Sequence, residues 1–283
     1  MEFSDAESRR RYDALVAVAR TGLVALDFDG TLSPIVDDPA AASIHPDGPR
    51  VLTELAGAVR AIALITGRPA QQVVDLGRLE GVADEIDRLG LPARLLVLGQ
   101  YGNQRWDSTT RRFSSADVPE GLSAFADELP GLLAEADAAG AFLEDKGLAI
   151  GVHTRRLADP DAAYARLRPL LADSAGRHGL GLEPGKQVLE VRAPGMDKGR
   201  ALLRVVEETS AGGLLFAGDD LGDLQAFRAG ERLRSEGMPV LLVCSGSTGQ
   251  TRPTELAGLA DVVVDGPAGV LALLADLARA SSI

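Results

Sequence analysis

The chain has 283 residues, of which 46% are hydrophobic and 25% charged, a balance typical of a globular protein of about two domains. Its net charge of −12 disfavours nonspecific binding to nucleic acid or to an anionic membrane. The single cysteine, Cys244, excludes an internal disulfide framework, and its apolar surroundings predict a buried, inert thiol. Because no segment has membrane-spanning length or a signal-peptide pattern, we expect a cytoplasmic chain without membrane, nucleic-acid or obligate protein partners.

The first hundred residues alternate between helical and strand patterns. The predicted elements are a helix at 4–20, a buried strand at 23–26, a helix at 48–60, a strand at 61–65, a helix after Pro69 and a strand at 94–98. This alternation is typical of an α/β fold with a doubly wound parallel sheet. The polar stretch 106–113 then indicates a hairpin or the exit from this core.

A different pattern occupies the middle of the chain. It predicts a helix at 119–139, short strands at 141–146 and 148–153, a helix at 160–177, a turn at Pro184-Gly185 and a strand at 187–191. Short strand pairs with two helices indicate an inserted α+β cap domain at 112–192, within a core made of residues 1–111 and 193–283. The core pattern resumes with predicted helices at 198–208, 223–232 and 269–280 and strands at 214–217, 240–243 and 262–264.

Two aspartates end the first apolar strand, in the sequence Leu26-Asp27-Phe28-Asp29-Gly30. Ligand crevices of open α/β sheets lie beyond the carboxyl ends of the strands, so both carboxylates should point into one. Two acids this close need a proton or a cation between them, and Mg²⁺ favours a few carboxylates together with substrate phosphate. The alternative, a simple Asp-Gly surface turn, does not require two acids behind a buried strand.

Three further points lie at strand ends or helix starts. Thr66 either caps the next helix or faces the crevice. Lys198, at a helix N-terminus, either points into solvent or compensates a bound anion. Asp219 and Asp220 follow another strand, and for Asp220 we favour a role as an N-cap. Their common placement points to one crevice that binds an anion and a metal ion.

These residues resemble the four motifs of the haloacid-dehalogenase superfamily of phosphotransferases, and the similarity covers the chain beyond about residue 20. The resemblance implies a Rossmann-like core with a cap, Mg²⁺ as cofactor, and phosphoryl transfer through an aspartyl-phosphate. It also implies Asp27 as nucleophile, Asp29 as acid and base, and Thr66 and Lys198 as ligands of the phosphoryl oxygens. The implied metal ligands are Asp27, the carbonyl of Asp29, Asp219 and Asp223.

Within that superfamily the chain resembles the trehalose-6-phosphate phosphatase family. The matching segments are Pro34-Ile35, Gly67-Arg68-Pro69, Glu144-Asp145-Lys146, His153-Thr154-Arg155 and Glu190. The resemblance implies hydrolysis of trehalose 6-phosphate, the final step of trehalose biosynthesis, with a sugar phosphate as the small-molecule partner. It implies as substrate-binding residues Gly67, Arg68, Glu144, Lys146, His153, Arg155 and Glu190. Composition alone would favour salt-bridged pairs on a solvated sheet face, and for His153 both sugar binding and structural packing stay open.

The chain departs from the family pattern at four positions. Gln104 replaces a frequent glutamate, and Gly222, Leu224 and Gln225 lie where the family has polar and acidic residues. We expect these changes to affect metal and substrate affinity rather than the reaction class. The alternatives are a phosphatase of glucosyl- or mannosyl-phosphoglycerate or of sucrose phosphate, with cations from Arg156, Lys186 and Arg192, a phosphomutase, or a non-catalytic sugar-phosphate sensor.

Overall fold

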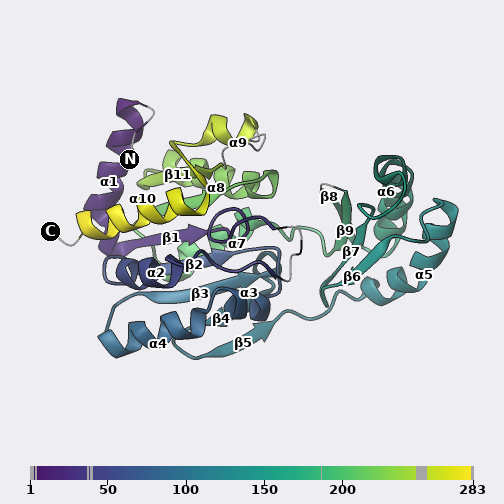
Figure 1. Cartoon of the computed structure of the whole chain (residues 1–283), viewed down its shortest axis with the longest axis horizontal. Coiled ribbons are helices and arrows are strands. Elements are labelled where there is room, and N and C mark those ends of the chain that lie inside the picture. The colour runs from purple at the N-terminus through teal and green to yellow at the C-terminus, as the bar shows by residue number, and fades with distance from the viewer. Residues whose placement is uncertain are drawn as a thin grey trace. The chain divides into compact units, whose positions relative to one another are not determined.

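The structure is a computed structural model that describes residues 3, 5–36, 38, 41–185, 187–246 and 254–281. It divides into two compact units (Figure 1). The first, here called the core unit, comprises Met1–Ser114 and Asp197–Ile283, and the second, here called the insert unit, comprises Ser115–Met196. The insert unit overlaps the segment 112–192 that the sequence analysis assigned to an inserted domain.

The core unit is built on an eight-stranded sheet among the described residues, in the order β12-β11-β10-β1-β2-β3-β4-β5. The six strands from β12 to β3 are parallel, and β4 pairs antiparallel with β3. In this order their bounds are Val262–Val264, Val240–Ser245, Gly213–Gly218, Gly22–Leu26, Ala61–Ile65, Arg94–Gly99, Gln104–Asp107 and Arg112–Ser115. The predicted doubly wound α/β core is confirmed, and the polar stretch after residue 105 forms the hairpin β4–β5.

Helices cover both faces of this sheet (Figure 1). Alternate residues of β1 enter different clusters, since Val24 and Leu26 pack in one while Leu23 and Ala25 pack in the other. The first cluster is covered by α1 (Ala6–Val18), α2 (Gly48–Ala56), α3 (Ala70–Leu76), α4 (Leu79–Leu89) and α10 (Gly266–Ala280). The second is covered by α7 (Lys198–Thr209), α8 (Leu224–Ser235) and α9 (Thr254–Leu259). Burial on both faces explains why these strands are continuous apolar runs.

Some predicted boundaries in the core unit are wrong. The helix expected after Pro69 is present as α3, but the sequence reasoning missed α4, which follows a break in the chain at Gly77 and Arg78. Arg78 has a left-handed φ of 51°, and a Cβ on Gly77 would lie 2.8 Å from the carbonyl oxygen of Val73. The last helix begins at Gly266 rather than at residue 269. As predicted, Cys244 is buried.

The insert unit is an antiparallel sheet in the order β6-β7-β9-β8, with two helices packed on one face. The strands are β6 (Phe142–Asp145), β7 (Ala149–His153), β9 (Val188–Arg192) and β8 (Gly181–Gly185), and the helices are α5 (Gly121–Glu135) and α6 (Pro160–Arg177). The expected turn at Pro184-Gly185 is wrong, because both residues belong to β8, which pairs with β9. Proline is tolerated there because β8 is an edge strand.

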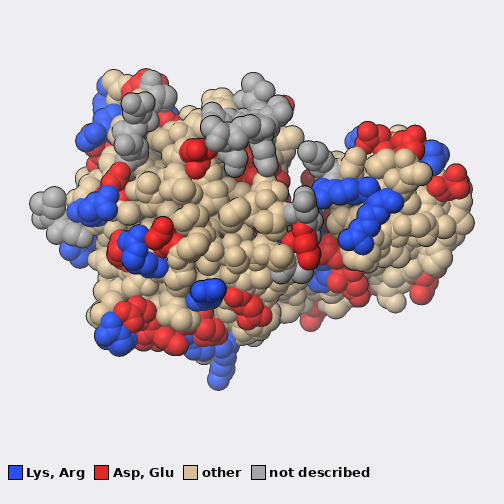
Figure 2. Space-filling model, viewed as in Figure 1, with Lys and Arg blue, Asp and Glu red and all other residues tan. Residues whose placement is uncertain are grey.

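Charged side chains of both signs are interspersed on the visible face of each unit (Figure 2). In the part of the chain that the structure describes, no helix combines the length and hydrophobicity needed to cross a bilayer.

Candidate active site

Asp27 follows β1 directly, at the carboxyl end of the sheet. Its backbone N–H donates to the carbonyl of Ala217 on β10 (2.9 Å), so the parallel pairing continues to the aspartate. The loop then folds back tightly, since Leu32 N and Ser33 N both donate to the carbonyl of Phe28 at 2.9 Å. The side chain of Asp27 is only 6% exposed. Strand pairing and this turn therefore fix a buried carboxylate at the carboxyl edge of the sheet, where the sequence predicted the site.

Lys198 joins Asp27 to Asp223. Its Nζ lies 2.6 Å from Asp27 Oδ1 and 2.7 Å from Asp223 Oδ1, and all three side chains are buried. Lys198 is the first residue of α7, and the side chain of Asp197 caps this helix by accepting from Arg200 N (2.8 Å). The ammonium therefore points toward these carboxylates and not into solvent. It opposes the helix dipole at a position where Asp27 and Asp223 compensate for it.

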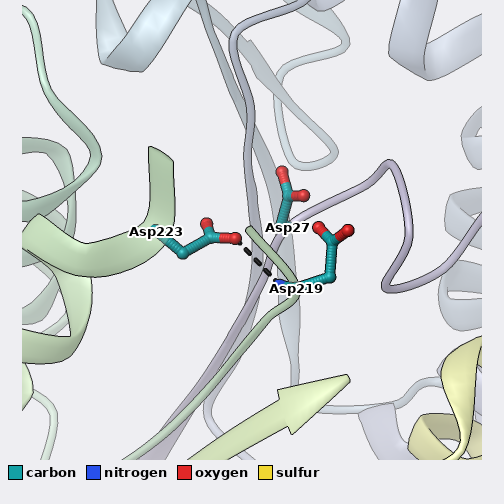
Figure 3. Close-up of side chains that lie close together, drawn as sticks. All are labelled: Asp27, Asp219 and Asp223. Atoms are coloured by element: carbon teal, nitrogen blue, oxygen red, sulfur yellow. Dashed lines mark hydrogen bonds between the residues drawn. The ribbon is translucent and has the colours of Figure 1, made fainter. Parts of the chain in front are cut away.

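The loop after β10 brings in Asp219 and Asp223. Asp223 Oδ2 accepts from the backbone N–H of Asp219 (3.0 Å) and of Asp220 (3.3 Å). Figure 3 shows the first of these bonds and the carboxyl groups of Asp27, Asp219 and Asp223 gathered in one region. Asp220 is the N-cap of η4 (Leu221–Asp223), since its side chain accepts from Gly222 N (2.8 Å), as we favoured. Asp223 thus orients the loop, while Asp219 projects from it.

Burial dominates the electrostatics of this cluster. Burial raises the pKa of Asp27 to about 8; the charge of Lys198 lowers this pKa and that of Asp223 raises it further. Burial also raises the pKa of Asp219 to about 9, and the charge of Asp27 adds to this increase. Burial also raises the pKa of Asp223. For Lys198 burial lowers the pKa, but Asp223 and Asp27 outweigh this and hold it well above the ordinary value. Lys198 therefore stays charged, while the carboxylates repel one another.

This cluster fits a hard divalent cation. Asp27, Asp219 and Asp223 each offer a carboxylate oxygen, and these atoms all lie within 4.8 Å of one another. When all three carboxylates are ionised, the single ammonium of Lys198 leaves two negative charges uncompensated, which adds to the effect of burial on their pKa values. The donor set is all oxygen, as Mg²⁺ prefers. Because Asp223 already accepts from Lys198 and two backbone amides, Asp27 and Asp219 are better placed to hold the ion directly.

Thr66 follows β2 at the same edge of the sheet and is buried. Its Oγ1 accepts from Arg68 N (3.1 Å), whereas the N-cap of α3 is Pro69, so Thr66 does not cap that helix. Arg68 ion-pairs with Asp29 through two parallel bonds, Nε to Oδ2 (2.6 Å) and Nη2 to Oδ1 (2.8 Å). The resemblance implied substrate binding by Arg68, and the structure places its guanidinium on Asp29, the predicted acid and base.

The four positions that depart from the family pattern have the following surroundings. Gln104 Oε1 accepts from Ala70 N (3.0 Å) and so satisfies the first turn of α3. Leu224 packs against the apolar cluster under α7 and α8. The backbone carbonyl of Gln225 closely approaches α7, because a Cβ on Gly199 would lie 2.5 Å from it. A Cβ on Gly222 would lie 2.9 Å from Asp220 Oδ1, so glycine at this position leaves room for the Asp220 side chain that forms the N-cap of η4.

A second polar cluster lies on the face of the insert sheet opposite its helices. Glu144, Gly151, Glu190 and Glu183 are directly opposite one another across the four strands. Lys146 Nζ lies 2.6 Å from Glu190 Oε2 and 3.8 Å from Glu144 Oε2. The next row adds His153, whose Nε2 lies 2.9 Å from Glu144 Oε2. The structure therefore brings together four of the five predicted substrate-binding residues of this unit.

The fifth, Arg155, is exposed in the turn after β7. Conversely, sequence reasoning did not assign Glu183 to this cluster, and it named Arg192 only as a spare cation. Arg192 Nη1 lies 2.7 Å from Glu190 Oε1, and its Nη2 lies 3.2 Å from Glu183 Oε2. The signal that could have found Glu183 is strand alternation, but the strand that carries it was predicted as a turn.

In the core unit sequence reasoning also missed Ser245, at the end of β11. Its buried hydroxyl donates to the carbonyl of Gly30 (2.6 Å), so it fixes the loop that carries Asp27 and Asp29. Its position at the carboxyl end of a core strand was the available signal.

Comparison with known proteins gives consistent results. A family model described as Trehalose-phosphatase matches residues 25–83 and 134–260, more than half of the chain. A protein of Sinorhizobium fredii (strain NBRC 101917 / NGR234), named probable trehalose-phosphate phosphatase, is 30% identical over 211 residues, which cover 74% of this chain and 73% of that protein.

A trehalose-phosphate phosphatase of Mycobacterium tuberculosis (strain ATCC 25618 / H37Rv) is 30% identical over 272 residues, which cover 93% of this chain and 62% of that protein. The chain thus spans less than two thirds of this relative. A solved structure of trehalose-6-phosphate phosphatase from Aspergillus fumigatus (crystal form 3) matches with a TM-score of 0.68 at 25% identity, covering 96% of this chain and 97% of that one.

Proposed function

Since this chain belongs to the trehalose-phosphatase family, we propose that it hydrolyses trehalose 6-phosphate to trehalose and inorganic phosphate. The observation that carries this proposal is the position of Asp27. Its carboxylate is buried at the end of β1, 2.6 Å from the ammonium of Lys198 and close to the carboxylate of Asp219. A buried carboxylate held beside a cation and a candidate metal site is the arrangement needed for nucleophilic attack on an anionic phosphate ester.

The proposed chemistry has two steps. An oxygen of Asp27 attacks phosphorus and forms an aspartyl-phosphate, while the bond from phosphorus to the sugar oxygen breaks and Asp29 donates a proton to that oxygen. Asp29 then takes a proton from water, whose oxygen attacks phosphorus and releases phosphate and the Asp27 carboxylate. Lys198 and Thr66 bind the phosphoryl oxygens, and Lys198 offsets the negative charge that develops there.

We propose Mg²⁺ as the cofactor, because the cluster offers oxygen donors and an excess of negative charge. Asp27 and Asp219 would hold it, with the Asp29 carbonyl implied by family resemblance and Asp223 orienting the loop. When bound, the ion would neutralise the carboxylates and the phosphate ester.

We propose that the insert unit is the cap and that its polar sheet face recognises the disaccharide. Glu144, Lys146, His153 and Glu190 form a connected set of donors and acceptors, which suits a ligand with many hydroxyl groups. A phosphoglycerate substrate would need spare cations. Arg192 is already paired with Glu190 and Glu183, the guanidinium of Arg156 lies 5.3 Å from the ring centre of Phe142, and Lys186 lies outside the described residues. Pairing of these arginines favours the uncharged disaccharide.

The test is phosphate release from trehalose 6-phosphate, sucrose 6-phosphate, glucose 6-phosphate and glucosyl-phosphoglycerate, with Mg²⁺ and with a chelator. We expect Mg²⁺-dependent preference for trehalose 6-phosphate and no turnover by Asp27→Asn. Preference for another substrate would keep the chemistry and discard the proposed sugar contacts. No release by the folded protein, or near-native turnover by Asp27→Asn, would overturn the proposal.

A further inference from the structure

The guanidinium of Arg68 and the carboxylate of Asp29 form a bidentate ion pair at the carboxyl edge of the core sheet. Nε lies 2.6 Å from Oδ2 and Nη2 lies 2.8 Å from Oδ1, so both carboxylate oxygens are engaged by one planar group. The Arg68 side chain is 14% exposed, whereas Asp29 is 39% exposed. A mostly buried arginine thus holds the more accessible carboxylate, and bidentate geometry fixes the orientation as well as the position of that carboxylate.

The backbone around Arg68 is fixed from both sides. Its N–H donates to Thr66 Oγ1 (3.1 Å), and its carbonyl accepts from Gln100 N (2.9 Å). Gln100 and Tyr101 have left-handed φ values of 48° and 57°, an unfavourable conformation for two successive non-glycine residues. Tyr101 N donates in turn to the carbonyl of Thr66 (2.9 Å). Such concentrated strain is typical of segments that hold a functional group in place.

We propose that Arg68 is a positioning residue that acts on the reaction through Asp29, and not a ligand of the phosphoryl group or of the sugar. The inference rests on the proposed function, in which Asp29 transfers a proton to the leaving oxygen and later removes one from water. Each carboxylate oxygen has two lone pairs, so the pair with Arg68 leaves one on each for that proton. Without the arginine, a half-exposed carboxylate on a loop rotates among orientations, of which few face the reacting oxygen.

The test is a double-mutant cycle with Arg68→Gln, Asp29→Asn and the double variant, measured as kcat/KM for trehalose 6-phosphate and for p-nitrophenyl phosphate. Because kcat/KM covers only the steps up to the first transfer, it isolates protonation of the leaving group, which a sugar alkoxide needs and p-nitrophenolate does not. We expect Arg68→Gln to lower kcat/KM for trehalose 6-phosphate roughly 10- to 100-fold, because it removes part of the rate enhancement that a general acid provides. For p-nitrophenyl phosphate we expect kcat/KM to fall less than about 3-fold.

The double variant should have the same kcat/KM for trehalose 6-phosphate as Asp29→Asn within about twofold. If Arg68 acts only by positioning the Asp29 carboxylate, its replacement has no further effect once that carboxylate is gone. The inhibition constant of inorganic phosphate should also stay within about twofold in Arg68→Gln, since a lost phosphate ligand would raise it about tenfold or more. Arg68→Lys keeps the charge but not the two parallel donors, and we expect it to behave as Arg68→Gln does. The matched control is Arg88→Gln, which breaks an exposed pair with Glu85 and should change neither substrate's rate.

Additive losses in the cycle, equal losses for both substrates, or weaker inhibition by phosphate would overturn the role of Arg68. These outcomes are distinct from failure of the proposed function. If the wild-type protein hydrolyses another sugar phosphate, the same cycle applies to that ester. If it hydrolyses p-nitrophenyl phosphate but no sugar phosphate, the proposed substrate fails, and a loss of p-nitrophenyl phosphate hydrolysis in Arg68→Gln then overturns this inference separately.

Discussion

The carboxylate of Asp219 packs directly against Gly30. A Cβ on Gly30 would lie 2.1 Å from Asp219 Oδ2, closer than any real contact allows, and the φ of Gly30 is +74°. The glycine of the first loop and the aspartate that follows β10 therefore determine each other's positions, although they lie 189 positions apart in the chain. This contact brings the carboxylate of Asp219 toward that of Asp27.

We expect Gly30→Ala to lower kcat/KM about 100-fold or more, because the new methyl group must displace the Asp219 carboxylate. The control is Gly90→Ala, whose φ of +63° is similar but whose Cβ would meet nothing within 4 Å. That variant should cost only about 1–2 kcal/mol of stability and no activity at 25 °C. Comparable activity of the two variants would show that the packing of Gly30 against Asp219 does not matter.

The buried carboxyl groups predict a pH dependence for the chelated protein. Burial raises the pKa of Asp219 from 3.8 to about 9, so the folded state binds this proton more tightly than the unfolded state does. Its contribution to stability is therefore full below pH 3.8 and is lost as the pH rises toward 9. We expect the Tm measured with a chelator to fall with pH across this window, and to fall less steeply in Asp219→Asn. A slope that is the same in both proteins would contradict this account.

Glu144→Gln tests the insert unit. The substitution keeps the shape of the side chain but removes the charge that faces His153 and Lys146. We expect KM for trehalose 6-phosphate to rise about tenfold, which corresponds to the binding free energy of one hydrogen bond to a charged group. We expect kcat/KM for p-nitrophenyl phosphate to stay unchanged. Glu135→Gln, at the exposed end of α5, is the matched control. Equal effects on both substrates would argue against a contact with the sugar.

Glu128 joins the two helices of the insert unit. It accepts from Ser174 Oγ (2.7 Å), lies 3.0 Å from His178 Nε2 and pairs with Arg177, and hydrogen bonding by these groups, Ser174 first, lowers its pKa from 4.5 to about 2. A carboxyl whose pKa is lowered on folding contributes stability above its unfolded pKa and loses it as the pH falls through the folded value. We expect Glu128→Gln to lower Tm at pH 7, with a difference from wild type that narrows as the pH falls from 4.5 toward 2. A constant difference, measured against Glu135→Gln, would contradict this.

Much of the core fold could be predicted because its signals are local. Short apolar runs such as Leu23–Leu26 become strands buried on both faces, and the residues that follow each run lie at one edge of the sheet. For this reason the placement of Asp27, Thr66 and Asp219 at that edge follows from the sequence alone, as does Lys198 at the start of a helix. Their roles in catalysis stay proposals.

Errors arose where tertiary packing overrides local preference. Pro184 and Gly185 are typical of a turn, yet pairing with β9 holds them in an edge strand. The sequence reasoning also missed α4, which begins after the left-handed backbone at Arg78, a conformation that no residue-type preference favours there.

The sequence by itself thus determined most of the strands and helices of the core, the sheet edge that carries the acids, and the family. Only the tertiary structure decided which charges meet, as in the pairs of Arg68 with Asp29 and of Lys146 with Glu190. The physical reason is that strand and helix patterns depend on neighbours within a few residues. An ion pair between residues about forty positions apart depends instead on strand register and rotamers that only the packed chain fixes.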